Sequence, residues 1–350
     1  MNKSEKLAYF GFQWHITDGC DQRCKHCYYD WDSNPCVNQG LPIEVLSEIL
    51  DNIIETCKKM NRQPHLCITG GDPLLYKDVW KFFSLLNEKK IKFVILGNPF
   101  HLDDEVAKRL KECGCVRYQM SLDGLRETHD FIRKKGSFDA TLSRIPVLKK
   151  AGITAAIMST ISKTNIDEIP NLVDIVVEHG ADTFAFARYC PNPNDKENIV
   201  TAAEYRSFLE KMWMKYTEYK DSNTWFVLKD HLWKLFLYEK KMIDIDDIQN
   251  PNNLIMDGCH CGISHLTILA DGTIYACRRC ESPVGHVPEQ SLYDIFFGKK
   301  MEPYRQYGKF AKCSKCELLN FCRGCPSVAK CMTGDFCAAD PQCWKKIDEW

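Results

Sequence analysis

The sequence has no apolar stretch long enough to cross a membrane. Its first residues, 1–6, are also not followed by the apolar segment of a signal peptide. These absences argue against membrane and secreted proteins, and they favour a cytoplasmic location. A charge imbalance is missing too, because the formal net charge is only −1. We therefore expect neither nucleic acid nor a membrane surface as a general partner.

Cysteine, in contrast, is abundant, with 20 in a chain of 350 residues. In a reducing compartment, thiols are rarely kept for disulfides, and disulfide-stapled scaffolds are much shorter than this chain. Thiolates are soft ligands that suit iron–sulfur clusters and zinc. We therefore favour metal or cluster ligation, with a secreted disulfide-rich protein as the alternative. The length predicts one large domain and a smaller one.

Three cysteines follow an alternating apolar segment, residues 12–17, which we predict to be the first strand. They are Cys20, Cys24 and Cys27, with the spacing C-x3-C-x2-C. Four thiolates would complete an iron–sulfur cluster, whereas three leave one iron with an open position. By the logic that separates catalytic from structural zinc sites, an open position is where a substrate or cofactor binds.

Short apolar segments alternate with segments of helical periodicity through residues 12–189. We predict strands at residues 12–17, 65–69, 92–96, 117–122, 154–160 and 184–187. We predict helices at residues 43–59, 79–88, 105–112, 140–151 and 166–178. This alternation favours right-handed βαβ units and a parallel sheet, either barrel-like or open. In both arrangements the active site lies at the C-terminal ends of the strands, where the three-cysteine loop is expected.

Two loops and one helix near that end carry candidate ligand-binding groups. After the second strand, Gly70-Gly71-Asp72-Pro73 could present a backbone platform to a polar ligand, or could be an ordinary βα turn. After the fourth strand, Ser121 and Asp123 could hold ribose hydroxyls, although Asp-Gly is also a common turn pair. Arg144 could clamp a carboxylate, although a single arginine on a helix more often faces solvent.

The alternation stops after Cys190. We predict helices at residues 202–219 and 228–239 and assign residues 191–257 to a helical bridge. Its aromatic residues are expected in the core, with a contribution to substrate binding as the alternative. A hairpin turned by Asp271-Gly272 should follow and bring Cys261 and Cys277 together. Ser291 should cap a short helix that ends at residue 297.

The C-terminal part contains a second concentration of cysteines. Its spacing C-x2-C-x5-C-x2-C is typical of a metal site but does not identify the metal. Zinc held by four thiolates is the structural alternative to a cluster. The tail cysteines are Cys313, Cys316, Cys322, Cys325, Cys331, Cys337 and Cys343.

Together these motifs resemble the radical S-adenosylmethionine (SAM) superfamily, and the C-terminal part resembles its SPASM subgroup. The matching residues are Cys20, Cys24, Cys27, Gly70-Gly71-Asp72-Pro73, Ser121-Leu122-Asp123-Gly124, Cys261 through Asp271-Gly272 to Cys277, Cys313, Cys316, Cys322, Cys325 and Cys343. The resemblance implies an α/β fold, in which a partial (β/α)6 radical SAM barrel over residues 1–190 holds a [4Fe–4S] cluster. The bridge over residues 191–257 and a small cysteine-rich SPASM domain over residues 258–350, with two auxiliary [4Fe–4S] clusters, would follow.

In that family the open iron binds the amino and carboxylate groups of SAM. One electron then cleaves SAM to methionine and a 5′-deoxyadenosyl radical, which takes a hydrogen atom from the substrate. The resemblance implies an electron donor such as flavodoxin or ferredoxin. It also implies SAM contacts through Gly70, Gly71 and Asp72 to the amino group, Ser121 and Asp123 to the ribose, and Arg144 to the carboxylate.

The SPASM order implies ligands for both auxiliary clusters. The outer cluster would be held by Cys313, Cys316, Cys322 and Cys343, and the inner one by Cys261, Cys277, Cys325 and Cys259. The usual pattern has three residues between the cysteines matched to Cys322 and Cys325, whereas this chain has two. Substitution by Cys280, Cys331 or Cys337 therefore stays open. We expect the remaining cysteines to be core or surface residues: Cys36, Cys57, Cys67, Cys113, Cys115 and Cys190.

SPASM proteins mostly modify peptides or proteins. Our hypothesis is the maturation of a short ribosomal peptide substrate, for example by a thioether or other crosslink. Because the first strand starts near Gly11, we expect no fused leader-binding domain, so that a separate partner or the bridge would recognise any leader.

Three alternatives stay open. Sulfatase-maturase-like protein modification is disfavoured, because Arg278-Arg279 follow Cys277 where that type has an aspartate. A small-molecule substrate is a second alternative, and a zinc-binding structural or regulatory module is a third. Metal content separates the enzyme from the zinc module, because the enzyme would hold ~12 iron atoms in three cubane clusters.

Overall fold

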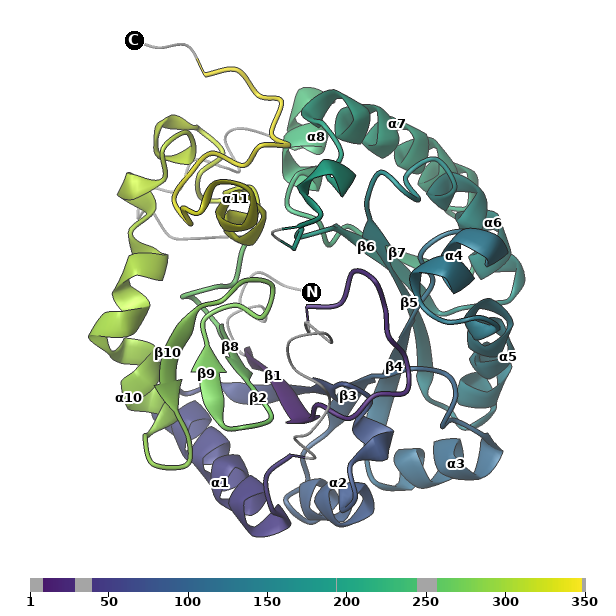
Figure 1. Ribbon diagram of the computed structural model, residues 1–350, viewed down its shortest axis with the longest axis vertical. Coiled ribbons are helices and arrows are strands. Elements are labelled where there is room, and N and C mark those ends of the chain that lie inside the picture. Colours follow the sequence, from purple (N-terminus) through teal and green to yellow (C-terminus); the bar gives the residue numbers. More distant parts are fainter. Residues whose placement is uncertain (1–8, 29–39, 193, 244–256, 348–350) are drawn as a thin grey trace.

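The computed structural model describes residues 9–28, 40–192, 194–243 and 257–347. Cys36 lies outside them. A curved ten-stranded sheet in the order β10-β9-β8-β1-β2-β3-β4-β5-β6-β7 runs through these residues. Figure 1 shows the helices arranged around the outside of the curved sheet. This arrangement leaves the inner side of the sheet available for a site.

The predicted parallel α/β unit is confirmed. Its strands are β1 (Tyr9–Thr17), β2 (Gln63–Gly70), β3 (Phe93–Leu96), β4 (Cys115–Ser121), β5 (Thr154–Ile161) and β6 (Thr183–Arg188). Each pairs in parallel with the next along the chain. The helices are α1 (Ile43–Lys59), α2 (Val79–Glu88), α3 (Asp104–Glu112), α4 (Arg126–Ile132), α5 (Ser137–Lys150) and α6 (Ile169–Glu178). Only the short α4 was not predicted.

Burial follows the periodicity of each element. On α1, Leu46, Ile49, Leu50 and Ile53 are fully or almost fully buried, at the spacing of one helix face. On β1 the alternate residues Phe10, Phe12, Trp14 and Ile16 are fully buried. The intervening residues of β1 therefore point to the other face of the sheet.

The βα alternation continues one unit further than predicted. After α7 (Ala202–Glu218), the strand β7 (Trp225–Val227) pairs in parallel with β6. The next helix, α8, spans Trp233–Glu239. The predicted helical bridge over residues 191–257 therefore contains a strand, and its second helix begins at residue 233 instead of residue 228. Three residues are too few to produce a legible alternation, so the sequence did not reveal β7.

The C-terminal part joins the same sheet through the predicted hairpin, β8 (His265–Ile268) and β9 (Thr273–Tyr275). Gly272, in its turn, has a φ of +92°, which favours glycine. β8 pairs in parallel with β1, and β10 (Pro283–His286) pairs with β9. The predicted short helix is α10 (Leu292–Phe297), capped by Ser291, and α11 (Pro326–Thr333) follows.

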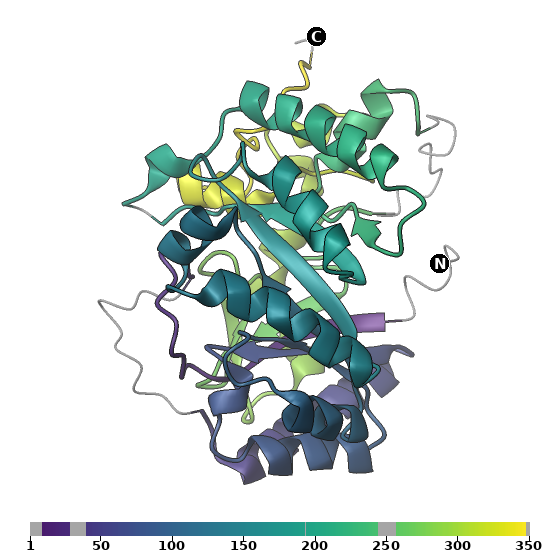
Figure 2. The ribbon, with the colours of Figure 1, turned by 90° about the vertical axis from the view of Figure 1, so that its right-hand side faces the viewer.

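The tail returns to the last helices of the α/β unit. Trp344 Nε1 donates a hydrogen bond to Glu239 Oε1 of α8 at 2.9 Å. In the view of Figure 1, α11 lies between α8 and β10. In the side view of Figure 2, the segment after β1 runs along the same end of the sheet as α4, and Lys25 N donates to Ile132 O at 2.9 Å. None of the helices in the described ranges is long and apolar enough to cross a membrane.

Candidate active site

A cavity of about 370 Å³ lies inside the curved sheet. The loop after β1 borders it with Cys20, Cys24 and Cys27. Of the predicted SAM-binding residues, Gly70, Gly71 and Ser121 also border it. The volume is within the range of small-molecule sites. The structure therefore brings the three-cysteine loop and two of the predicted loops to one cavity.

Polar side chains of several strands line this cavity. They include Gln13 and His15 of β1, Gln119 of β4 and His265 of β8. Burial, together with the charge of Arg278, holds the pKa of His15 well below its usual value. His15 is therefore a neutral imidazole near pH 7, able to donate or accept a hydrogen bond.

Gly70 and Gly71 allow the loop after β2 to approach the chain that leads to the cysteines. Gly71 N donates to Thr17 O at 2.8 Å, and Asp72 N donates to Gly19 O at 2.6 Å. A Cβ on Gly71 would lie 2.2 Å from Gly19 O, and Gly70 has a φ of +144°. The two glycines thus hold the cysteine loop in place, because larger residues would separate the two segments.

Asp72 is fully buried next to this contact, outside the lining of the cavity. Its Oδ1 accepts a hydrogen bond from Leu74 N at 3.2 Å, whereas Oδ2 has no hydrogen-bond partner among the described residues. Burial, with a further contribution from Asp21, raises the pKa of Asp72 to about 7. Asp72, which we predicted to contact the SAM amino group, is thus held behind the glycine loop and not at the cavity.

This raised pKa predicts a pH-dependent gain in stability for Asp72→Asn in the SAM-free protein. In the unfolded chain the carboxyl titrates near 3.9, so the cost of ionising it in the folded protein grows as the pH rises towards 7. We expect the substitution to stabilise the protein by about 2 kcal/mol at pH 5.5 and about 4 kcal/mol at pH 8. Thermal unfolding at both pH values measures this. An equal effect at the two pH values, or the same result for the exposed control Asp167→Asn, would contradict the prediction.

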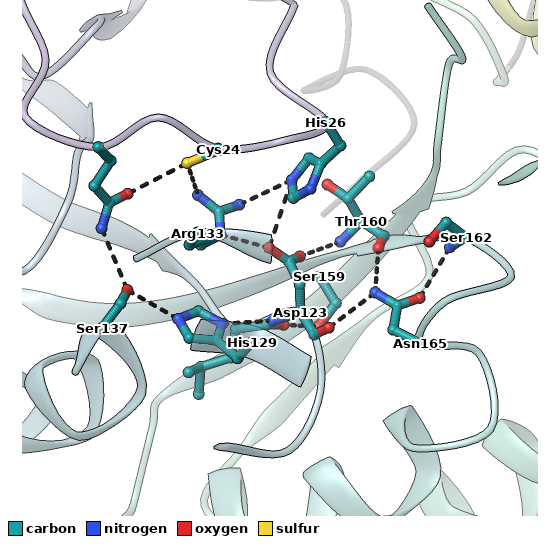
Figure 3. A network of polar contacts seen from close by, with 12 residues as sticks. Cys24, His26, Asp123, His129, Arg133, Ser137, Ser159, Thr160, Ser162 and Asn165 are labelled. Carbon is teal, nitrogen blue, oxygen red and sulfur yellow. Dashed lines mark hydrogen bonds and ion pairs between the residues drawn. The ribbon is translucent and has the colours of Figure 1, made fainter. Parts of the chain in front are cut away.

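Asp123 is the centre of a polar network that connects the cysteine loop to β4 and β5 (Figure 3). Its carboxylate accepts hydrogen bonds from Arg133 Nε and, at 2.7 Å, from Thr160 N. His26 Nε2 lies 3.5 Å from the same carboxylate. Arg133 Nη1 lies 3.6 Å from Cys24 Sγ. Asp123 therefore orients Arg133 against a cysteine of the loop and does not itself border the cavity.

The charges in this network are balanced. Burial alone would raise the pKa of Asp123, but Arg133 and the histidines beside it hold that pKa below its usual value. Burial lowers the pKa of His26 to about 4, so this imidazole is neutral near pH 7. Its Nε2 lies 3.4 Å from Arg133 Nη2, and its ring meets that of Tyr189 edge-on at 6.4 Å.

A second set of contacts supports the network from α5 (Figure 3). His129 Nδ1 accepts a hydrogen bond from Asp123 N at 3.0 Å, and its Nε2 lies 2.9 Å from Ser137 Oγ. Gln22 Nε2 donates to Ser137 Oγ at 3.2 Å. Gln22 Oε1 in turn lies 3.5 Å from Cys24 Sγ. The cysteine loop is thus anchored through side chains that are far apart in the sequence.

Arg144 is placed differently from the other predicted SAM-binding residues. Its Nε donates to Pro99 O at 3.2 Å, and it does not border the cavity. Arg133 does border the cavity, on the segment after α4. Sequence reasoning missed Arg133, because nothing in the local pattern distinguishes it from the other basic residues of residues 126–135.

The cysteines of the C-terminal part fall into separate groups. The four that we predicted for the outer cluster lie close enough to interact electrostatically: Cys313, Cys316, Cys322 and Cys343. The thiols of Cys259 and Cys261 lie close enough to interact, as do those of Cys277 and Cys280. The Sγ atoms of Cys277 and Cys280 lie 3.0 and 3.4 Å from Ser327 Oγ.

Cys325 lies in a third group. Its thiol interacts with that of Cys190, which also contacts Cys331. Arg279 Nη1 lies 3.4 Å from Cys325 Sγ. We expected Cys190 to be an ordinary core or surface residue. It is instead buried beside two other cysteines, Cys325 and Cys331, and it also borders the cavity. The electrostatic interactions of the Cys337 thiol are with Asp335 and Lys309, and not with the cysteines predicted for either auxiliary cluster.

The described thiols do not form a compact site for a single zinc ion. Ligands of one zinc ion lie within about 4.6 Å of one another, because each thiolate sulfur is about 2.3 Å from the metal. In the described part of the chain, the only group of three possible ligands within 4.8 Å of one another is Asp21, Asp72 and His101, which contains no thiol. No three of the described thiols are therefore gathered as closely as the ligands of one zinc ion.

Two family models match this chain. One, described as the radical SAM superfamily, matches residues 14–176, and the other, described as the SPASM iron–sulfur cluster-binding domain, matches residues 259–326. Among curated relatives, the chain is 28% identical over 342 residues to an AdoMet-dependent heme synthase of Methanosarcina barkeri, covering 94% of this chain and 95% of that one. It is 24% identical to the sporulation killing factor maturation protein SkfB of Bacillus subtilis, over 87% of this chain and 68% of that one.

The fold is also similar to solved structures. Streptococcus suis SuiB bound to the precursor peptide SuiA has a TM-score of 0.75 at 19% identity, covering 97% of this chain and 76% of SuiB. Native anSMEcpe with bound AdoMet has a TM-score of 0.74 at 18% identity, covering 95% of this chain and 94% of that one. At these identities the similarity establishes the shared fold.

Proposed function

Because this chain belongs to the radical SAM superfamily and carries a SPASM domain, we propose that it is a SAM-cleaving enzyme that modifies a peptide. The observation that carries the proposal is the shared cavity. Cys20, Cys24 and Cys27 border it together with Cys277 and Arg278 of the C-terminal part. A substrate in this cavity would lie between the cysteine loop and the SPASM domain.

The three thiolates would hold a [4Fe–4S] cluster and leave one iron open for SAM. When bound and reduced, this cluster supplies the electron that cleaves SAM to methionine and a 5′-deoxyadenosyl radical. Dithionite, or a donor such as flavodoxin or ferredoxin, would reduce it. The protein contributes Arg133, whose cation lies near Cys24 Sγ and offsets part of the negative charge of the thiolates.

For SAM itself, we propose contacts from Gly70 and Gly71, which border the cavity, to the amino group. Asp72, buried outside the lining of the cavity, would act by holding this loop through the hydrogen bond from its backbone N to Gly19 O. Ser121 would contact the ribose. Asp123 would not contact SAM itself but would orient Arg133, which does border the cavity. Arg133 borders the cavity, so we now propose it ahead of Arg144 as the partner of the SAM carboxylate. The walls of the cavity would keep water and other hydrogen donors from the radical.

Two observations support a peptide as the substrate. SuiB, of matching fold over almost the whole chain, has been solved with its precursor peptide, and SkfB is named as a maturation protein. The test is anaerobic reconstitution, a dithionite-driven assay for 5′-deoxyadenosine, and mass spectrometry of short peptides encoded beside the gene. We expect 5′-deoxyadenosine together with a mass change in one peptide, such as the loss of hydrogens on crosslinking. SAM cleavage with no mass change in any of these peptides would overturn the peptide assignment.

A porphyrin is the second candidate substrate. It is favoured by the 28% identity to an AdoMet-dependent heme synthase over nearly the full length of both chains. The same reconstituted enzyme should be incubated with iron porphyrins that carry carboxylate side chains. Their mass change, with peptides left unmodified, would replace the peptide by a porphyrin.

We also propose two auxiliary clusters, with the outer one held by Cys313, Cys316, Cys322 and Cys343. For the inner one, the contacts of Cys280 with Cys277 support Cys259, Cys261, Cys277 and Cys280 as ligands. The SPASM pattern instead supports Cys325 in place of Cys280.

Iron counting in two variants separates these sets. We expect Cys280→Ala to lower the iron content from about 12 to about 8 atoms per chain, because an inner cluster with three thiolates would be labile. Cys325→Ala should leave the iron content nearly unchanged. The reverse result would assign the inner cluster to Cys325.

A further inference from the structure

We propose that the cavity contains a subsite for a carboxylate of the substrate, formed by Lys229 and Arg278 with the support of Arg279. This inference rests on the proposed function, because it names the chemistry of the substrate. Among the described residues that border the cavity there are five arginines and lysines and no aspartate or glutamate: Arg133, Arg188, Lys229, Arg278 and Arg279. A cavity lined in this way attracts anions.

Two of these cations are already paired with carboxylates from behind the cavity wall. Arg133 forms an ion pair with the fully buried Asp123. Arg188 Nε lies 3.0 Å from Asp230 Oδ2, and its Nη1 lies 2.9 Å from Asp340 Oδ1. Their charges are compensated inside the protein, so they do not require an anion in the cavity.

Lys229, two residues after β7, is a cation that forms no ion pair with a carboxylate among the described residues. The hydrogen-bond contact of its Nζ is with Met158 Sδ, at 3.9 Å. Met158 is in register with Ser121 at the C-terminal end of β4, so Lys229 reaches towards the strand ends that border the cavity. The side chain is exposed and borders the cavity, and desolvation by the surrounding residues lowers the pKa of its ammonium.

Arg278 and Arg279 follow β9 and approach from the C-terminal part. The guanidinium of Arg278 lies 5.0 Å from the centre of the Tyr28 ring, and its Nε is buried without a hydrogen-bond partner among the described residues. Arg279 donates to Arg188 O and lies 3.4 Å from Cys325 Sγ, neither of which is a carboxylate.

Cations that border a cavity and have no carboxylate partner among the described residues are best matched by a carboxylate of the ligand. A guanidinium binds a carboxylate through two parallel hydrogen bonds, and an ammonium adds a point charge. Both candidate substrate classes carry such groups, on acidic residues or the C-terminus of a peptide and on the side chains of many porphyrins. SAM also has a carboxylate, so the test must separate SAM from the substrate.

The test uses glutarate as the probe and glutaramide as its uncharged counterpart. Titration calorimetry of the reconstituted enzyme, at low ionic strength, without reductant, and both with and without saturating SAM, should show millimolar binding of glutarate and none of glutaramide. Lys229→Met and Arg278→Gln should each weaken glutarate binding by about tenfold or more, and Lys229→Arg should retain it. Lys211→Met, at a half-exposed lysine paired with Asp167, is the matched control and should bind like the wild type.

Three results would overturn the subsite. The first is that the wild type does not bind glutarate, and the second is that Lys229→Met and Arg278→Gln bind it as tightly as the control Lys211→Met. The third is that the wild type binds glutarate without SAM but not when SAM is added. The last would show that the cations hold the SAM carboxylate. The assay for 5′-deoxyadenosine in the wild type is separate. If SAM is not cleaved but glutarate binds as expected, the proposed function fails while the subsite stands, and the opposite outcome removes only the subsite.

Discussion

Cys24→Ala is expected to lower the rate of SAM cleavage at least about 1000-fold. The variant would keep only two thiolates of the loop, which cannot hold the cluster, and losing the reactive group removes most of an enzyme's rate enhancement of about 10⁶ or more. Cys24 is also the thiol nearest to Arg133 and to Gln22. Its loss therefore breaks the contact between the loop and the Asp123 network as well.

The measurements are 5′-deoxyadenosine formation and iron content after reconstitution. Iron should fall from about 12 to about 8 atoms per chain, because the auxiliary clusters use other cysteines. Cys113→Ala is the matched control, since Cys113 lies at the end of α3 and is not among the residues that border the cavity. Cleavage by Cys24→Ala at a rate close to that of Cys113→Ala would refute the assignment of the three-cysteine loop.

Arg188→Met should destabilise the folded protein by about 3–5 kcal/mol. Arg188 is fully buried at the end of β6 and bonds to Asp230 after β7 and to Asp340 in the tail. Its Nη1 also donates to Gln342 Oε1 at 2.9 Å. Methionine keeps most of the volume but leaves two carboxylates buried without their cation. The contact between the barrel and the tail should weaken first.

Anaerobic thermal unfolding of the reconstituted protein measures this effect. Arg206→Met removes a half-exposed arginine that lies 3.2 Å from Glu239 and should cost less than about 1 kcal/mol. The combined variant Arg188→Met, Asp230→Asn, Asp340→Asn should recover part of the loss, because no uncompensated charge stays buried. Equal unfolding temperatures for Arg188→Met and Arg206→Met would show that the buried ion pairs do not connect the two parts.

Local patterns predicted most of the α/β unit. The bounds of α1 and α2 agree with the predicted residues 43–59 and 79–88, because their apolar residues recur at the spacing of a helix face. β7 and α4 were missed, since segments of three and seven residues are too short to show a period. The cysteine spacing likewise indicated the three-cysteine loop, which the structure places at the cavity.

The sequence by itself therefore determined the strands and helices, the end of the sheet that carries the site, and the resemblance to radical SAM and SPASM proteins. Tertiary structure decided which charges are paired. Arg188 and Asp340 are 152 residues apart in the sequence and 2.9 Å apart in the fold, whereas Lys229 and Arg278 border the cavity without a carboxylate partner among the described residues. It also placed Cys325 beside Cys190 and Cys331. Periodicity and spacing depend on neighbouring residues, but the pairing of buried charges and thiols depends on how distant strands and loops are brought together.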